Sequence, residues 1–243
     1  DLVISGTKMW ITNGLKADWC CLLANTSEGA AHKNKSLIVV PMDAKGITRQ
    51  KITKVGMNSS DTAQLFFDDV RVPARNIIGQ EGLGFTMQML QFQEERLYAA
   101  ASALKGFDRL IDLTIDYTSQ RQTFGKPILD NQVVHFRLAE LRTEVEALRA
   151  LTWSAIEKYV SGKDVTKLAS MAKLKTGRLA REITDSCLQY WGGMGYTFDN
   201  PVSRAWRDTR LVSIGAGADE IMLGIIAKLE GTLPGTGNRV RRN

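Results

Sequence analysis

The chain has 243 residues, of which 44% are hydrophobic and 24% charged, and it carries a formal net charge of +6. This composition suits one large or two modest globular domains with their own cores, and no apolar run approaches the length of a membrane span. The basic residues are spread along the chain and mixed with acids, so the charge suits an anionic ligand or acidic partner and does not single out nucleic acid.

Cysteine and histidine are scarce. The cysteines are Cys20, Cys21 and Cys187, a spacing that fits neither a disulfide framework nor a metal site, and there are only two histidines. We therefore expect a reducing compartment and no metal. The one dense basic run, Arg239-Val240-Arg241-Arg242, is interpreted as a solvated end.

Residues 1 to about 75 have the pattern of β structure. Polar and glycine-containing stretches, such as Gly6 and Asn13-Gly14, separate short runs rich in strand-forming residues. These runs are Leu2-Val3-Ile4, Lys8 to Thr12, Trp19 to Leu23, Ser36 to Val40 and Ala63 to Phe67. No helical pattern intervenes, which favours an antiparallel sheet or a partial barrel over βαβ units. Val72-Pro73 closes this region.

Helical periodicity begins after Gly82. The pattern predicts helices over about 82–121, from about 130, from an N-cap at Asp164 to Trp191-Gly192-Gly193, and over about 218–229 before Gly231. Long antiparallel helices with short links predict an up-down four-helix bundle. The chain is therefore expected to be an α+β multidomain protein, with a partial β domain at 1–75 and a helical bundle at 76–243.

One carboxylate in the first helix stands out. Phe85, Met89, Phe92, Ala99 and Ala103 recur at three- and four-residue steps, and Glu95 falls on the same predicted apolar face. A carboxylate there must be paired, hydrated or chemically used, because burying an ionised carboxylate alone is costly. Pairing with Arg96 or a lysine is the simpler interpretation. The small residues from Ala99 to Ala103 also leave room for a flat ligand or a close helix.

Two glycine-containing turns next to helices each allow two interpretations. Gly79, Gly82 and Gly84 could hold a phosphate at a helix N-terminus, although a tight turn is favoured because no dinucleotide fingerprint is present. Arg121-Gln122-Thr123-Phe124-Gly125-Lys126-Pro127 offers a cation, a hydroxyl and an aromatic face that suit a nucleotide. It could equally be a plain helix–helix turn.

Three further segments are also ambiguous alone. Gln189 to Tyr196 could let a ligand approach its glycines, or could be a helix C-cap followed by an aromatic turn. Ile214 to Ile221 could present free N–H groups to an oxyanion, or its acids could simply favour the helix N-terminus. Trp10 and Thr12, on alternate strand residues, could form a platform for a planar ring, or belong to a hairpin with a packed indole.

Taken together and in this order, these segments resemble the acyl-CoA dehydrogenase family. The matching pieces are Gly6 to Gly14, Gly82 to Phe85, Glu95-Arg96-Leu97, Arg121 to Pro127, Gln189 to Tyr196 and Gly215 to Glu220. The resemblance covers nearly the whole chain and implies the later part of the family's middle β domain followed by its C-terminal helical domain. The family's N-terminal helical domain has no counterpart in this sequence.

The resemblance also implies a cofactor site. Trp10 and Thr12 would lie against the flavin ring of FAD, with Ile11 between them and Thr12 near flavin N5. The residues implied to hold the FAD of a neighbouring subunit are Arg121, Thr123, Phe124, Gln132, Gln189, Tyr190, Trp191, Gly192 and Gly193. Shared sites imply a homodimer, usually within a homotetramer. Ala218 replaces the family's usual threonine, so one FAD contact is expected to differ.

The position of the catalytic base follows from the same resemblance. Most members carry a glutamate before the glycine of a Tyr-Glu-Gly-Thr motif, but here that position is Ala216. Isovaleryl-CoA and long-chain dehydrogenases place the base on the long first helix, where Glu95 followed by Arg96-Leu97 matches. The resemblance therefore makes Glu95 the catalytic base. Residues implied to bind substrate are Gln93, Glu94, Arg96, Gly215, Ala216 and Gly217.

The implied reaction is FAD-dependent α,β-dehydrogenation of an acyl-CoA to the trans-2-enoyl-CoA, with electrons passed to an electron-transfer flavoprotein. Such reactions belong to fatty acid β-oxidation or branched-chain amino acid catabolism. An acyl-CoA oxidase-like enzyme that uses oxygen and a non-catalytic fragment that binds CoA or FAD are the alternatives. Family habit implies the mitochondrial matrix in a eukaryote or the cytoplasm in a bacterium, with no stable membrane insertion.

Overall fold

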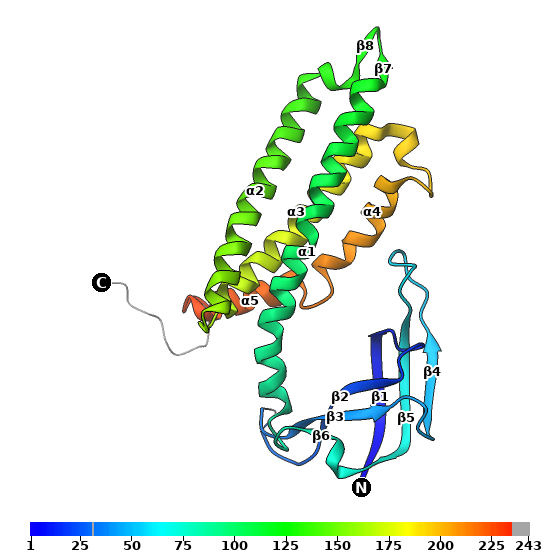
Figure 1. The fold of residues 1–243 in the computed structure, drawn as a ribbon, viewed down its shortest axis with the longest axis vertical. Coiled ribbons are helices and arrows are strands. Elements are labelled where there is room, and N and C mark those ends of the chain that lie inside the picture. Colours follow the sequence, from blue (N-terminus) through cyan, green and yellow to red (C-terminus); the bar gives the residue numbers. More distant parts are fainter. Residues whose placement is uncertain (31, 235–243) are drawn as a thin grey trace, which may run out of the picture. The chain divides into compact units, whose positions relative to one another are not determined.

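The fold is described from a computed structural model, which covers residues 1–30 and 32–234. The basic run Arg239 to Arg242 lies outside the described residues. The chain divides into two compact units, Asp1–Gln91 and the part from Phe92 onward, which are described separately here (Figure 1). The predicted combination of an antiparallel β region followed by a helical bundle is confirmed.

The first unit contains two open antiparallel sheets of three strands each. Their orders are β1-β5-β4 and β2-β3-β6. The strands are β1 (Leu2–Thr12), β2 (Trp19–Asn25), β3 (Lys35–Pro41), β4 (Ile47–Lys51), β5 (Thr62–Val72) and β6 (Ile77–Ile78). A short 3₁₀ turn, η1 (Ala74–Asn76), separates β5 from β6. In the described residues these strands form two open sheets, which do not close into a barrel.

The core of this unit comes from alternating strand residues. In β5, Ala63, Leu65 and Phe67 are buried while the residues between them are only half-buried. Gly6 does not end a strand as expected, because β1 continues through it with a register shift between Ile4 and Gly6. The shift places Asp68 and Asp69 of β5 opposite the single residue Ser5, so the β-bulge lies on β5, where Asp69 has a left-handed φ of 49°.

The glycine turn before the first long helix is structural. Gly79 and Gly82 have positive φ values of 69° and 83°. The amide of Gly82, which a phosphate would need, donates instead to Ser36 Oγ at 2.9 Å. Gly84 packs directly on the backbone of Ser36 and Leu37. The interpretation as a tight turn is therefore supported.

Long helices dominate the second unit. They are α1 (Gly84–Gln120, which begins in the first unit), α2 (Gln132–Val160), α3 (Thr166–Gly195), α4 (Pro201–Thr209) and α5 (Asp219–Leu229). Short elements connect them: the β7–β8 hairpin (Gln122–Thr123 and Lys126–Pro127), η2 (Ile128–Asp130) and η3 (Arg210–Ser213). None of the described helices has the length and apolarity that a membrane crossing requires.

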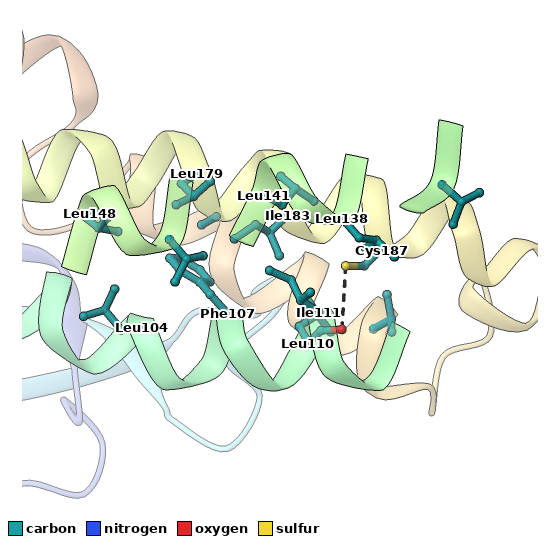
Figure 2. Close-up of a cluster of buried hydrophobic side chains, with 14 residues drawn as sticks. Leu104, Phe107, Leu110, Ile111, Leu138, Leu141, Leu148, Leu179, Ile183 and Cys187 are labelled. Atoms are coloured by element: carbon teal, nitrogen blue, oxygen red, sulfur yellow. Dashed lines mark hydrogen bonds between the residues drawn. The ribbon is translucent and has the colours of Figure 1, made fainter. Parts of the chain in front are cut away.

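The core of the bundle is apolar and built by α1, α2, α3 and α4. Figure 2 shows Leu104, Phe107 and Ile111 of α1 pointing toward side chains of α2 and α3. Facing them are the fully buried Leu141 and Ile183. Complete burial of such side chains stabilises the bundle by about 1.5–3 kcal/mol each.

The two ends of α3 lie close to their predicted positions. The N-cap is Val165, one residue after the predicted Asp164, whose carboxylate accepts from the Thr166 amide at 3.3 Å, and the Val165 amide donates to Gln93 Oε1 of α1 at 2.8 Å. The helical backbone is interrupted by a kink at Gly192, where φ is 55° and ψ is −139° and where the helix was predicted to end, and a further helical segment continues to Gly195. The kink needs a backbone conformation that glycine tolerates far better than other residues.

Candidate active site

The strand segment Trp10–Thr12 belongs to the first unit. Trp10 is 69% exposed and has a φ of 64°, a left-handed conformation that is strained for a bulky residue. Ile11 packs against the sheet core, whereas Thr12 is exposed. The indole and the hydroxyl are therefore available to a ligand, while Ile11 could contact one only through its backbone. Backbone strain of this kind is often found at functional sites.

Glu95 lies on a different face of α1 than predicted. The buried side of this turn is formed by Gln93, Arg96, Leu97 and Ala100, and Glu95 is exposed. The expected apolar face through Phe92 and Ala99 is only half-buried. The predicted placement on the apolar face is therefore wrong. The Glu95 side chain is exposed on α1, and its role as the base remains a prediction.

Its neighbours on α1 connect this turn to other helices. Glu94 Oε2 accepts a hydrogen bond from the Tyr159 hydroxyl at 3.4 Å, and Gln93 is committed to the start of α3. The predicted substrate roles of Gln93 and Glu94 would have to coexist with these packing contacts.

Arg96 points into the bundle. Its guanidinium donates to Ser170 Oγ at 3.4 Å and lies 5.5 Å from the centroid of the Phe92 ring. Its Nε is buried and has no hydrogen-bond partner among the described residues. Burial lowers the pKa of Arg96, and the nearby Glu95 opposes this. A buried guanidinium with an unsatisfied nitrogen is costly, which suggests a role beyond packing.

The predicted nucleotide-binding residues gather at the other end of the bundle. In the β7–β8 hairpin, Phe124 and Gly125 have φ values of 52° and 82°, as a type I′ turn requires. Phe124 is fully exposed at the tip, and Arg121 and Gln132 are exposed nearby in the chain. Figure 1 shows this hairpin at the end of the bundle where α1 finishes and α2 begins.

Two contacts bring the segment Gln189–Gly193 to this same end. The Trp191 ring stacks on Tyr117 near the end of α1, and the Tyr190 hydroxyl donates to the carbonyl O of Val133 at the start of α2 at 3.0 Å. Gln189, Gly192 and Gly193 remain exposed, and a Cβ added at either glycine would meet nothing within 4 Å. The nine predicted residues, from three parts of the sequence, thus lie at one end of the bundle. Most of them are exposed there, whereas the Trp191 ring packs on α1 and the Tyr190 hydroxyl bonds to α2.

The loop before α5 contains Gly215, Ala216 and Gly217. Ala216 has a φ of 52° and Gly217 a φ of 95°. Lys173 of α3, which is buried, donates from Nζ to the carbonyl O of Gly217. Lys173 also interacts electrostatically with Arg96. The turn of α1 that carries Glu95 and the loop before α5 therefore approach the same side of α3.

Sequence analysis missed Lys173. It lies within the apolar stretch Leu168 to Leu174, where helical periodicity places it beside Ala169 and Ala172 on the buried face. A lysine within such a run was the signal that could have found it, because lysine is almost never fully buried without a partner. Among the described residues, no group of three or more histidine, cysteine or acidic side chains could hold a metal.

Comparison with known proteins agrees with this architecture. Residues 1–70 match the model of the acyl-CoA dehydrogenase middle domain, and residues 82–230 match that of the acyl-CoA dehydrogenase C-terminal domain. Cyclohexane-1-carbonyl-CoA dehydrogenase of Geobacter metallireducens is 39% identical over 94% of this chain and 60% of its own length.

Solved structures show the same likeness. The acyl-CoA dehydrogenase of Geobacillus kaustophilus has a TM-score of 0.90 and 39% identity, with 93% of this chain and 60% of that chain covered. A structure of PigA with FAD and proline has a TM-score of 0.91 and 25% identity, with 95% and 60% covered. The chain thus spans about 60% of the length of these relatives.

A β unit of antiparallel sheets followed by a helical bundle defines an α+β protein of two units. The chain belongs to the acyl-CoA dehydrogenase family and contains its middle- and C-terminal-domain regions.

Proposed function

We propose that this protein catalyses the FAD-dependent α,β-dehydrogenation of an acyl-CoA thioester, with Glu95 as the catalytic base. The observation that carries the proposal is the pairing of an exposed Glu95 with a loop, Ile214–Ala218, that contains no carboxylate. Arg96, the residue after Glu95, interacts electrostatically with Lys173, and Gly217 of the loop accepts a hydrogen bond from Lys173. The loop that carries the base in most members of the family therefore offers no carboxylate here, and we assign the base to Glu95 on the first long helix.

The residues present fit FAD. Trp10 offers an exposed aromatic face and Thr12 an exposed hydroxyl for a flavin ring. At the hairpin end, exposed Arg121 and Gln189 suit a pyrophosphate and the polar groups of a nucleotide. The open backbone at Gly192 and Gly193 allows a ligand to approach closely.

The chemistry assigned to the chain is proton removal and binding. Glu95 takes the α-proton of the thioester, and FAD, when bound, supplies the acceptor for the hydride that leaves the β-carbon. A carbon acid beside a thioester is weak, so the enolate-like oxygen needs a hydrogen-bond donor, for which a backbone N–H group in the loop at Ala216 is suitable, because the N–H groups near Glu95 belong to the interior of α1. Arg96 is assigned to binding of the substrate, because it cannot act as a base.

Helix geometry supports a site shared between subunits. At about 1.5 Å per residue, Glu95 and Gln120 lie about 38 Å apart along α1. The hairpin that follows Gln120 is therefore far from the base of its own chain. Its nucleotide-binding groups are best explained if they hold the FAD that serves a second copy, so we propose a homodimer or homotetramer.

The test is to replace Glu95 by Gln and mix the FAD-loaded protein with a panel of acyl-CoAs anaerobically. Loss of the flavin absorbance near its visible maximum reports reduction. The E95Q variant is expected to bind FAD normally but to be reduced at least about 10³-fold more slowly, as loss of a general base commonly costs 10²–10⁴-fold. The control is E157Q, which changes an exposed glutamate of α2 and should leave reduction unchanged. Reduction of E95Q at the normal rate would overturn the assignment.

The same reduced protein distinguishes the electron acceptors. We propose that an electron-transfer flavoprotein reoxidises it rapidly and that oxygen does so slowly. Rapid oxygen uptake would identify an acyl-CoA oxidase-like enzyme instead. A preparation that binds CoA or FAD but reduces no flavin with any acyl-CoA would indicate a non-catalytic module.

A further inference from the structure

The most unusual buried group of the second unit is the ammonium of Lys173. The side chain is only 1% exposed, in the middle of α3, yet its Nζ reaches the carbonyl O of Gly217 in the loop before α5. Lysine is rarely buried to this extent, because removing its charge from water is costly. The hydrogen bond therefore ties the loop before α5 to the buried face of α3.

The surroundings of Lys173 partly compensate its charge. Burial lowers the pKa of Lys173, while the carboxylates of Asp219 and Glu220 oppose this and Arg96 adds to it. Asp219 is itself buried and is bonded by Arg181 at 3.4 Å, and its other oxygen has no partner among the described residues. A buried lysine flanked by both an acid and an arginine is an electrostatic arrangement that packing alone would not require.

The loop itself needs an external constraint. Ala216 adopts a left-handed φ of 52°, a conformation that is unfavourable for a residue other than glycine. Gly217 has a φ of 95°, and a Cβ added there would meet Met222 Cε at 2.6 Å. The exposed position of Ala216 leaves few contacts that could hold this conformation from the solvent side. The hydrogen bond from Lys173 restrains the carbonyl group of Gly217, the residue that follows Ala216.

We infer that Lys173 is a positioning residue that holds the loop Gly215–Ala218 in the conformation required to bind the acyl-thioester. The inference rests on the proposed function, since it takes this loop to contact the substrate. Lys173 touches neither substrate nor cofactor and acts only through the Gly217 carbonyl. Arg96, on the turn of α1 that carries Glu95, is near enough to Lys173 for its like charge to lower the pKa of Lys173.

The test compares Lys173→Met with Lys175→Met in the FAD-loaded protein. Methionine keeps most of the apolar stem but cannot donate to the carbonyl, and replacing a buried charge by an apolar group of similar size is often tolerated. Lys175 lies two residues further along α3, its side chain is 40% exposed and it pairs with Glu144 on α2, so it controls for loss of a lysine from α3. If the ordered loop falls to about a tenth of the molecules, the apparent affinity for acyl-CoA falls about tenfold.

We expect K173M to raise KM for the preferred acyl-CoA about tenfold and to change kcat less than about threefold, while K175M changes neither. Elastase, which cleaves after small residues, is expected to cut the substrate-free K173M within residues 215–218 at least about tenfold faster than K175M. Lys173→Gln, which keeps an uncharged donor, should recover part of the difference in both measurements.

Equal KM values and equal elastase rates for K173M and K175M would overturn the inference. If K173M fails to fold, the same measurements are made on K173Q and compared with those on K175M. Failure of both Lys173 variants to fold would overturn the inference and show that Lys173 is a structural residue of the bundle. The elastase measurement uses no substrate. It therefore reports on the loop even if the wild-type protein oxidises no acyl-CoA, an outcome that would refute the proposed function alone.

Discussion

Tyr117 and Trp191 stack face to face, with ring centroids 4.0 Å apart and ring planes inclined by 6°. Trp191 Nε1 also donates to Thr114 Oγ1 at 3.2 Å. Tyr117 precedes the hairpin that begins at Arg121, and Trp191 precedes the kink at Gly192. The pair therefore fixes the distance between the two segments that we propose hold one nucleotide.

Replacing Trp191 by Leu is expected to destabilise the second unit by about 2–3 kcal/mol. The variant loses the stacked ring pair, the indole hydrogen bond and part of the buried aromatic area. Guanidinium-induced unfolding, followed by circular dichroism, measures the change. Trp153 of α2 is 51% exposed, so Trp153→Leu should cost less than about 1 kcal/mol. Equal losses for the two variants would show that the stack contributes nothing.

A pH-dependent contribution is expected from Asp108, which braces α1 against α2. Its carboxylate accepts from Arg142 and from Arg149, each at 2.8 Å. Burial pushes the pKa of Asp108 upward, but the bonds from Arg149 and Arg142 outweigh it and hold the pKa below its ordinary value. The unfolded chain therefore takes up the proton first as the pH falls, and the unfolded state is favoured.

Asp108→Asn should cost about 1–2 kcal/mol at pH 7. The stabilisation by Asp108 is complete above its unfolded pKa of about 4 and disappears as the pH falls through the lower folded pKa. The difference between wild type and D108N in urea unfolding should therefore shrink below about pH 4. Asp112→Asn removes a carboxylate that is 63% exposed and should have a much smaller effect. A constant difference from pH 7 to pH 2.5 would contradict the prediction.

Much of this fold followed from the sequence, and the failures have physical causes. The strand β4 (Ile47–Lys51) was not predicted because only Ile47 in it is apolar and pairing with β5 supplies the rest of its order. The short helix α4 was missed as well. Its signal was present in Asn200-Pro201, where the Asn200 side chain caps the Val202 amide at 2.8 Å and proline occupies the first turn.

For the candidate site, residue types were easier to predict than orientations. α1 carries apolar residues around more than one face, so the series through Phe92 and Ala99 competed with the series through Leu97 and Leu104, and the second is the buried one. A contact between distant residues, such as Trp191 with Tyr117, has no local signature. Both segments could be named from the sequence, but their convergence required the structure.

The cysteines should differ sharply in reactivity. Cys187 is fully buried in the bundle core, where its Sγ lies 3.9 Å from the carbonyl O of Leu110 (Figure 2), and burial raises the pKa of its thiol to about 11. Cys21 of β2 is exposed, although burial also raises the pKa of its thiol. Because the thiolate is the reactive form, Cys187 is both inaccessible and almost entirely protonated at neutral pH.

Iodoacetamide at pH 8 should therefore alkylate Cys21 first and leave Cys187 unmodified until the protein unfolds. Peptide mass spectrometry at timed intervals, with and without guanidinium, measures the order. We expect the native rate at Cys187 to be at least about 10²-fold below that at Cys21, since a thiol with pKa near 11 is about 0.1% ionised at pH 8. Comparable rates in the native protein would show that the bundle core opens readily.

The same substitution at two glycines of α1 should have opposite effects. Gly84 begins the helix against another segment of the first unit: a Cβ there would come within 2.5–2.8 Å of backbone atoms of Ser36 and Leu37. Backbone atoms cannot move aside cheaply, so Gly84→Ala should destabilise the first unit by about 1–3 kcal/mol.

Gly106, in the middle of the same helix, has nothing within 4 Å of its Cβ position. Gly106→Ala should instead stabilise the bundle by about 0.5–1 kcal/mol, because alanine restricts the unfolded chain and favours the helix. Thermal unfolding of the two variants beside wild type measures both signs. A stabilising G84A would mean that the turn before α1 is held less closely to β3 than these contacts require.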